Sequence, residues 1–404
     1  MNACLYLAFL VSIIFGGSIY FGPASPRQYM TVLVFSYLLL HSEKVKKYWD
    51  KYLSLYLLFA LFYGLSSYME GALGDFIREF ISRYMVCIVG YIATRCYLEN
   101  KNNYRHIIIV ILCCGVLNSL VTLLQYFRYP IGMAIGALFV DMDNLLEYYR
   151  FQHMADGDAG TTYFGMMSNG VFNGYFTMIL PILVIYFLYE ERSKGTPNAF
   201  KEITCWGLWG LFILCSFIIQ ERGPFLIAVM VTAYIMLRES KYKIALLSAV
   251  VIVFLFVIPS LLDSNLWRES RLAAGSDLSN DSRVRIYSLA MDFIVTHPLF
   301  GGIRTVTSII GNMPHNFFIN AFIYGGIIGG VIILYIIYVQ LRRSFILVHK
   351  NLSLMMPLSL IAYTLNGLTH NPSIITGEVL MWMMWGCVQF DYYKHAGYKL
   401  KVKI

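Results

Sequence analysis

The sequence contains few charged residues for its length. Only 13% of the 404 residues are Asp, Glu, Lys or Arg, whereas soluble domains are typically about one quarter charged. Apolar residues make up 58% of the chain, and long apolar runs recur from one end to the other. This composition excludes an ordinary soluble domain and predicts an all-α polytopic integral membrane protein.

The sequence also lacks cysteine pairs and metal-ligand clusters in its polar segments. All eight cysteines fall within apolar runs or at their ends, so we predict no disulfide, no metal and no cofactor. Asp141-Met142-Asp143 resembles the metal-binding DxD of sugar-nucleotide transferases. A lone DxD is a weak signal, so a polar loop is the favoured interpretation, with His153 in the same loop a surface residue.

The apolar runs predict about twelve membrane-spanning helices, and a count of about eleven or thirteen also fits. The segment 128–140 is apolar enough to be re-entrant. The predicted spans are residues 2–22, 28–41, 52–69, 80–97, 106–127, 170–189, 203–220, 224–238, 244–262, 316–341, 352–370 and 376–393. They divide the chain into N-terminal transmembrane helices (1–127), a first large periplasmic loop (128–169), central helices (170–262), a second large periplasmic loop (263–315), and C-terminal helices with a cytoplasmic tail (316–404).

Lysine is absent from one of the two faces that these spans define. With both termini in the cytoplasm, every lysine lies on the inner side, so the net charge of +8 is a topology signal and does not indicate nucleic-acid binding. The positive-inside rule explains part of this asymmetry. Arginine also binds phosphate and carboxylate through a planar fork, so the outer arginines indicate an anionic substrate. They are Arg27, Arg78, Arg83, Arg128, Arg150, Arg222, Arg268, Arg271, Arg283, Arg285 and Arg304.

The second large loop contains a predicted amphipathic helix. Between Arg285 and Val295, apolar residues recur with helical spacing, which is typical of a helix lying on a membrane surface. His297-Pro298 is expected to end this helix, and Gly301-Gly302 to form a turn. Arg283 and Arg285 precede its apolar face, although a solvated basic face is the simpler interpretation of Arg283.

A Pro-His-Asn step lies at the boundary between this loop and the next apolar segment. His315 therefore sits where a predicted membrane helix emerges into water, a suitable place for proton transfer. Taken alone, His315 is better explained as an interfacial histidine that caps or anchors a helix. The pairs Gly325/Gly329 and Gly326/Gly330 form small-xxx-small patterns, which allow another helix to pack closely.

The turn Glu221-Arg222-Gly223-Pro224 lies between two predicted spans. An arginine at the membrane surface is costly without a partner, so Arg222 is a candidate functional residue. An ion pair with Glu221 or snorkelling of the side chain is the alternative. Pro224 suits the first turn of the following helix.

Three of these features together resemble the superfamily of O-antigen ligases and O-antigen polymerases of the bacterial envelope. The first is a His followed by Asn, nine residues and Gly, here His315, Asn316 and Gly326. The second is Arg222-Gly223 at the outer end of a span. The third is an arginine before an amphipathic segment that ends in Pro-x-x-Gly, here Arg285 and the segment 298–301. The usual Gly-x-Gly continuation is replaced by Gly301-Gly302-Ile303.

The resemblance implies a metal-independent, inverting glycosyltransferase on the periplasmic face of the bacterial inner membrane. The implied donor is a glycan on undecaprenyl pyrophosphate, and the acceptor is a second glycolipid. His315 is the expected general base, and Arg222 and Arg285 are expected to hold the pyrophosphate. The residues expected to contact substrate are Asn316, Arg283, Arg150 and Arg304.

Polymerase and ligase share these motifs, and we favour the polymerase because both large loops are modest in size. A chain-length regulator and membrane lipids are the further expected partners. A flippase of the same lipid-linked glycan is less favoured, because transporters place charged residues within their spans, and here the span centres are almost free of charge.

Overall fold

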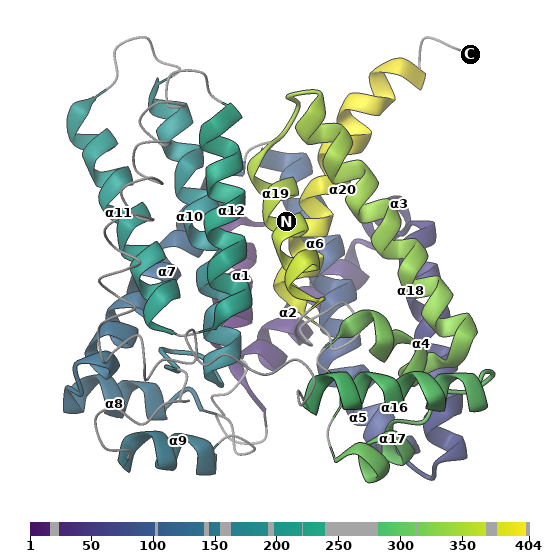
Figure 1. The fold of residues 1–404 in the computed structure, drawn as a ribbon. Helices are drawn as coiled ribbons and strands as arrows, with labels where there is room; N and C mark the ends of the chain where they lie inside the picture. Colours follow the sequence, from purple (N-terminus) through teal and green to yellow (C-terminus); the bar gives the residue numbers. More distant parts are fainter. Residues whose placement is uncertain are drawn as a thin grey trace. The chain divides into compact units, whose positions relative to one another are not determined.

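The structure is a computed structural model, and every regular element in its described residues is a helix (Figure 1). The described residues are 1–16, 24–101, 104–140, 145–153, 163–192, 198–219, 221–238, 282–311, 313–314, 316–368 and 378–400. The helices are α1 (Ala3–Phe15), α2 (Pro26–Leu40), α3 (Ser42–Tyr48), α4 (Lys51–Met69), α5 (Leu73–Glu79), a π-helical turn (Phe80–Tyr84), α6 (Met85–Lys101), α7 (Arg105–Tyr126), α8 (Pro130–Ala137), α9 (Leu145–His153), α10 (Gly170–Arg192), α11 (Ala199–Ile218), α12 (Arg222–Arg238), α16 (Ser282–Thr296), α17 (Ile303–Ile310), α18 (Phe317–His349), α19 (Met355–Asn366) and α20 (Val379–Leu400).

Five of the described helices are long and apolar enough to cross a membrane, namely α4, α7, α10, α11 and α18. The shorter helices α1 and α12 are also apolar. A helix lies on every predicted span except 244–262, which is outside the described residues. The described part of the chain is therefore all-helical with five helices able to cross a membrane, while the count of twelve spans and the placement of the loops stay predictions.

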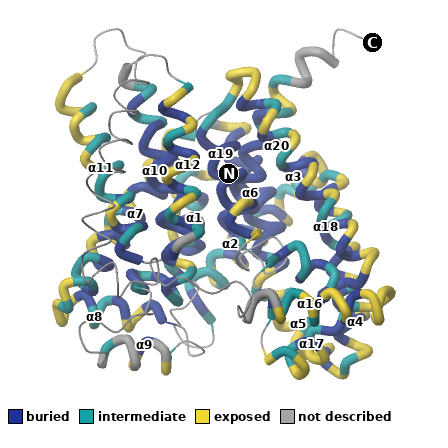
Figure 2. Tube along the Cα trace, in the orientation of Figure 1, coloured by how far each residue is buried: buried dark blue, intermediate teal, exposed yellow. Residues whose placement is uncertain are grey.

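The chain forms two compact units. The first comprises Met1–Ile13, Arg27–His106 and Ser276–Ile404, and within it α4 packs along α18 and α6 packs along α20. The second comprises Ile14–Pro26 and Ile107–Gly275, and within it α10 packs against α11 and α12. In Figure 2, α4 and α18 each have one buried side and one exposed side, as expected for helices that contact protein on one side only.

Small residues allow α4 and α18 to approach closely, as the small-xxx-small pattern predicts. A Cβ atom added at Gly325 or Gly329 would lie 3.1 or 3.2 Å from the Phe59 ring of α4. The second pair has a different environment. Gly326 faces the loop that precedes α17, and Gly330 faces the side chain of Phe322 on its own helix. The two overlapping patterns therefore serve different contacts.

Helix α18 is interrupted at Gly325 and Gly326, where the backbone leaves helical geometry. Gly325 has φ −126° and ψ 15°, and Gly326 has φ 63° and ψ −168°, a conformation that is nearly exclusive to glycine. An interruption of this kind leaves backbone groups without partners inside the helix. The sequence pattern did not indicate it, because the apolar segment continues without a break.

The loop between α16 and α17 supplies the missing hydrogen-bond partners. The N–H of Gly302 donates to the carbonyl of Ile323 at 2.8 Å, and the N–H of Ile327 donates to the carbonyl of Pro298 at 2.9 Å. A Cβ at Gly301 would clash with the carbonyl group of Ile323. We call this contact between residues 298–302 and the interruption of α18 the backbone clasp.

Replacing either glycine of the backbone clasp should separate the loop from α18. Gly301→Ala and Gly326→Ala each place a methyl group against backbone atoms, and overpacking of this kind costs about 1–3 kcal/mol. Gly326→Ala also forces alanine into a glycine-only backbone region. Thermal unfolding of the purified protein in detergent should show both variants unfolding at clearly lower temperature than the parent.

Gly207→Ala is the matched control for these two variants. Gly207 lies within α11, and a Cβ there would meet no atom within 4 Å. The Gly207→Ala substitution should therefore leave the free energy of unfolding unchanged or raise it by about 0.5–1 kcal/mol. If Gly301→Ala and Gly326→Ala unfold at the temperature of Gly207→Ala, the backbone clasp does not stabilise the fold.

Candidate functional site

The predicted site residues are divided between the two units. Those in the first unit are Arg283, Arg285, Arg304, His315 and Asn316, and those in the second are Arg150 and Arg222. His315 lies outside the described residues. Arg150, Arg222 and Arg283 lie in helices whose backbone is described, but their side chains are not. Each unit therefore holds its own group of candidate residues.

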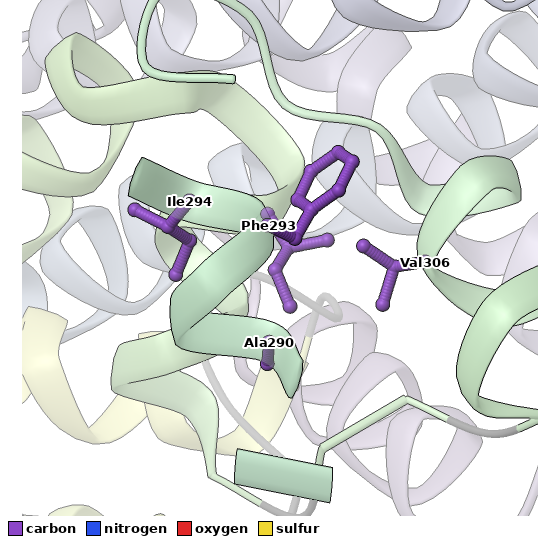
Figure 3. Close-up of a cluster of buried hydrophobic side chains, with 5 residues drawn as sticks. Ala290, Phe293, Ile294 and Val306 are labelled. Carbon is purple, nitrogen blue, oxygen red and sulfur yellow. The ribbon is translucent and has the colours of Figure 1, made fainter. Parts of the chain in front are cut away.

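Helices α16 and α17 pack on the N-terminal half of α18 through a small apolar core (Figure 3). The core consists of Ala290, Phe293, Ile294, Val306 and Ile323. The predicted helix in this loop is confirmed, since α16 ends at Thr296, just before His297-Pro298. Helix α17 was not predicted from the sequence. We call residues 282–310 the α16–α17 module.

Arg285 lies on the outer side of the α16–α17 module. Its side chain is exposed, whereas Ala290 and Ile294 on the opposite side of α16 are buried. Within the part of the chain that the structure describes, its guanidinium has no hydrogen-bond or ion-pair partner. Arg285 is thus held on a packed helix with its donors available to an anionic ligand.

Arg304 is instead engaged by the carboxylate of Asp75, at 2.6 Å. This hydrogen bond holds the pKa of Asp75 below its ordinary value, so the pair persists at neutral pH and is lost as the pH falls through that lowered pKa. Glu70 caps α17 by accepting from the backbone N–H groups of Arg304 and Thr305 at 3.0 and 2.8 Å. Arg304 therefore joins α17 to α5, a structural role that the sequence did not indicate.

The residues on either side of His315 are fixed by hydrogen bonds. The Asn320 side-chain amide donates to the carbonyl of Pro314 at 2.8 Å. The oxygen of Asn316 caps α18 by accepting from the N–H groups of Phe318 and Ile319 at 2.9 and 3.2 Å. Its nitrogen donates to the carbonyl of Leu368, just after α19, at 3.2 Å. Asn316, predicted to contact substrate, thus has a role in fixing the start of α18.

In the second unit, the turn that carries Arg222 packs on α10. Glu221 is buried, and a Cβ added at Gly174 of α10 would lie 3.0 Å from its Cβ and 3.3 Å from Pro224. Helix α12 begins at Arg222, so Pro224 lies in its first turn as predicted. The backbone of Arg222 therefore marks a helix N-terminus, where the helix dipole favours anions.

A buried polar network holds the loop that precedes α10. Gln125 of α7 accepts from the N–H of Gly165 at 2.8 Å and donates to its carbonyl at 3.1 Å. The Asn118 oxygen accepts from the N–H of Met166 at 2.8 Å, and its nitrogen donates to Asn173 of α10 at 2.6 Å. The network fixes the end of the first large loop directly beside Gly174, on which the Arg222 turn packs.

Sequence reasoning missed this network, although a signal for it exists. Asn118, Thr122 and Gln125 recur at helical spacing on one side of an otherwise apolar helix, and all three are fully buried. Amide and hydroxyl side chains on one face of a membrane helix usually bond to a neighbouring element, since lipid offers them no partner. The pattern therefore predicts a polar contact, but it does not identify a backbone loop as the partner.

Comparison with models of known protein families gives no match, and comparison with curated proteins gives no significant similarity. Asp141 and Asp143 lie outside the described residues, and the side chain of His153 is not described. Within the described residues, no group of His, Cys, Asp and Glu has the arrangement of a metal site.

Removing the side chain of Asn316 should loosen the start of α18. Asn316→Ala loses the cap and the bond to Leu368, so it should lower the free energy of unfolding by about 1–2 kcal/mol. Asn316→Asp keeps the capping oxygen, but its carboxylate cannot donate a hydrogen bond to the Leu368 carbonyl. This variant should therefore lose less free energy of unfolding than Asn316→Ala but should not reach the parental value. Thermal unfolding in detergent measures both effects.

Asn169→Ala provides the control, because the Asn169 side-chain oxygen caps α10 by accepting from the N–H of Phe172 at 2.9 Å. Its effect should be the smaller one, since the Asn316 side chain also joins two helices. Equal losses for Asn169→Ala and Asn316→Ala would show that the bond to Leu368 contributes nothing.

Proposed function

We propose that the protein is a membrane glycosyltransferase of bacterial surface-polysaccharide assembly. The favoured activity is that of an O-antigen polymerase, which joins repeat units carried on undecaprenyl pyrophosphate at the periplasmic face of the inner membrane. The main alternative is an O-antigen ligase, which transfers the finished polysaccharide to lipid A-core. In both activities a membrane-embedded enzyme acts on lipid-carried substrates, in accord with the apolar helices of this chain.

The backbone clasp is the observation that carries this proposal. Two of the sequence motifs that define the resemblance, Pro298-x-x-Gly301 and His315-Asn316 with Gly326, are separate in the sequence. In the fold, Gly301 packs on Ile323, and Gly326 packs on Leu299. The spacing of both motifs thus has one physical explanation, because each ends at a glycine that this backbone contact requires. Two motifs that meet in one contact are expected of a single functional unit.

In the proposed reaction, an acceptor hydroxyl oxygen attacks the anomeric carbon of the donor sugar. The bond between that carbon and the pyrophosphate oxygen breaks, so the configuration inverts and undecaprenyl pyrophosphate leaves. His315 takes the hydroxyl proton as general base. Arg285, exposed on the α16–α17 module, and Arg222, at the start of α12, neutralise the charge that develops on the pyrophosphate.

The lipopolysaccharide of a strain that lacks the gene tests the proposal and separates its two forms. Core carrying a single repeat unit indicates loss of the polymerase. Core alone, with lipid-linked polymer accumulating, indicates loss of the ligase. Unchanged lipopolysaccharide and unchanged lipid-linked intermediates would exclude both activities.

The His315→Ala variant tests the general base. A general base contributes roughly 10²–10⁴-fold in rate, so polymerised or ligated product should nearly vanish while binding of the lipid-linked donor survives. Activity should be measured with purified variants and isolated lipid-linked donor, after an immunoblot shows normal membrane insertion. Parental activity in a well-inserted His315→Ala protein would exclude the general-base role and favour an interfacial anchor at this position.

The Arg222→Lys variant tests bidentate recognition of pyrophosphate. Lysine keeps the charge but loses the planar fork, so Arg222→Lys should be nearly as damaging as Arg222→Ala. Both should weaken donor binding as well as turnover, because the pyrophosphate is charged before and after the transition state. Arg285→Ala should act in the same direction but more mildly, since Arg283 is close in sequence.

Arg78→Ala is the matched control for these arginine variants, because Arg78 is a strongly exposed arginine of α5 with only a 3.7 Å contact to Asp75. It should retain parental activity. If Arg78→Ala and Arg222→Ala lose activity equally, the effect reflects the loss of outer positive charge and not a specific pyrophosphate contact.

A further inference from the structure

A second candidate site lies in the first unit, where α4 begins beside the middle of α18. The ammonium group of Lys51, the first residue of α4, donates to the Tyr335 hydroxyl at 3.2 Å. It also lies 5.3 Å from the ring centre of Tyr52 and 5.8 Å from that of Tyr335. Lys51 is exposed, and 41% of Tyr335 is exposed. An exposed cation with aromatic rings at the end of a span is typical of the membrane–water boundary.

Exposed apolar residues form a continuous side on each of these two helices. On α4, Leu58, Leu61, Leu65 and Tyr68 follow Lys51 and Ser54 at helical spacing. On α18, the exposed side runs through Ile327, Ile328, Val331, Tyr335 and Tyr338. Because Lys51 belongs to the first side and Tyr335 to the second, the hydrogen bond between them marks the point where the two sides meet. Apolar sides of membrane helices that contact no protein contact acyl chains.

A second cation, Arg343 of α18, contacts Tyr52 at the start of α4. The guanidinium of Arg343 donates to the Tyr52 hydroxyl at 2.9 Å and to the Gln389 side-chain oxygen. It also lies over the rings of Tyr52, Tyr392 and Tyr393, at 4.5 to 4.9 Å. All these partners are neutral, so they fix the position of the charge without cancelling it.

The neighbouring carboxylate does not neutralise either cation. Asp50 forms its ion pair with Arg95, at 3.1 Å, and also accepts from Tyr91. Within the described parts of the chain, neither Lys51 nor Arg343 forms an ion pair with a carboxylate. Two fixed positive charges therefore lie beside Tyr52 without a carboxylate partner among the described residues, next to a surface that is suited to acyl chains.

We infer that Lys51, Tyr335 and Arg343 bind the headgroup of an anionic glycerophospholipid, whose acyl chains lie along the exposed sides of α4 and α18. The phosphodiester supplies the negative charge that both cations lack, and the Tyr335 hydroxyl supplies a further donor. Basic sites between membrane helices on the cytoplasmic side recognise anionic headgroups in this way. The inferred site is on the lysine-rich face and contains none of the residues assigned to glycosyl transfer, so it does not rest on the proposed function.

Native mass spectrometry of the full chain in neutral detergent tests this inference, with dioleoyl phosphatidylglycerol and dioleoyl phosphatidylcholine as probes. The parent should retain phosphatidylglycerol in preference to phosphatidylcholine. Lys51→Gln should weaken the binding of phosphatidylglycerol about five-fold, the effect of one basic residue at a membrane surface. Binding of phosphatidylcholine should not change. Arg343→Gln should have a similar effect on phosphatidylglycerol.

Lys47→Gln is the matched control, because Lys47 is an exposed lysine on the same face whose charge is already paired with Glu99. It should retain parental binding of phosphatidylglycerol. Lys51→Arg keeps the charge and should also retain most of the binding, which keeps the test valid if Lys51→Gln folds poorly. Glycerol phosphate, which carries the headgroup chemistry without acyl chains, should not compete at matched concentrations.

Three results would overturn the inference. The first is equal retention of phosphatidylglycerol and phosphatidylcholine by the parent. The second is parental binding of phosphatidylglycerol by Lys51→Gln, or an equal loss in Lys47→Gln, which would reflect general surface charge. The third is competition by glycerol phosphate, which would indicate a soluble phosphate ligand in place of a lipid.

Discussion

The satisfaction of backbone hydrogen bonds at the interruption of α18 is the constraint on which the first unit depends. A membrane interior contains no water to pair with freed N–H and C=O groups, and each unpaired group costs several kcal/mol. Helix α18 departs from helical geometry at Gly325 and Gly326, and the loop at residues 298–302 supplies partners on both sides of this point. The loop and the interruption therefore require each other. The small apolar core of the α16–α17 module also holds α16 and α17 against the N-terminal half of α18.

Much of the polar chemistry near this contact maintains the fold. Asn316 caps α18 and reaches Leu368, Asn320 holds the carbonyl of Pro314, and Glu70 caps α17. Arg285 is different, since its exposed guanidinium has no partner within the described residues. A site for an anionic substrate needs both kinds of residue. The donors that bind the ligand must be held in place by groups that do not themselves bind it.

In the second unit, side chains and not a backbone loop form hydrogen bonds with the backbone groups of an irregular segment. Gln125 pairs with both the N–H and the carbonyl of Gly165, as a neighbouring peptide group would. Gly165 adopts a positive φ, and a Cβ there would clash with the polar groups of α7 and α10. An irregular segment can thus lie at the level of apolar helices because buried amides satisfy its backbone. The turn at Glu221–Pro224 packs on the same part of α10, which explains why Gly174 has no side chain.

The sequence by itself predicted an all-helical chain with apolar helices able to cross a membrane, where most of these helices lie and where α16 ends, because hydropathy, periodicity and proline act over short stretches of chain. The cap at Asn316 was not predicted, because the family resemblance assigned Asn316 to substrate contact, although an asparagine before an apolar run is also a common helix start. The interruption of α18, the pairing of Arg304 with Asp75 and the amide network around Gly165 were decided only by the tertiary structure. A glycine pair looks the same in sequence whether it packs on a helix or accepts a loop, and a polar side chain does not show which distant group will bond to it. These outcomes depend on partners far away in the chain, and only the folded arrangement brings those partners within hydrogen-bonding distance.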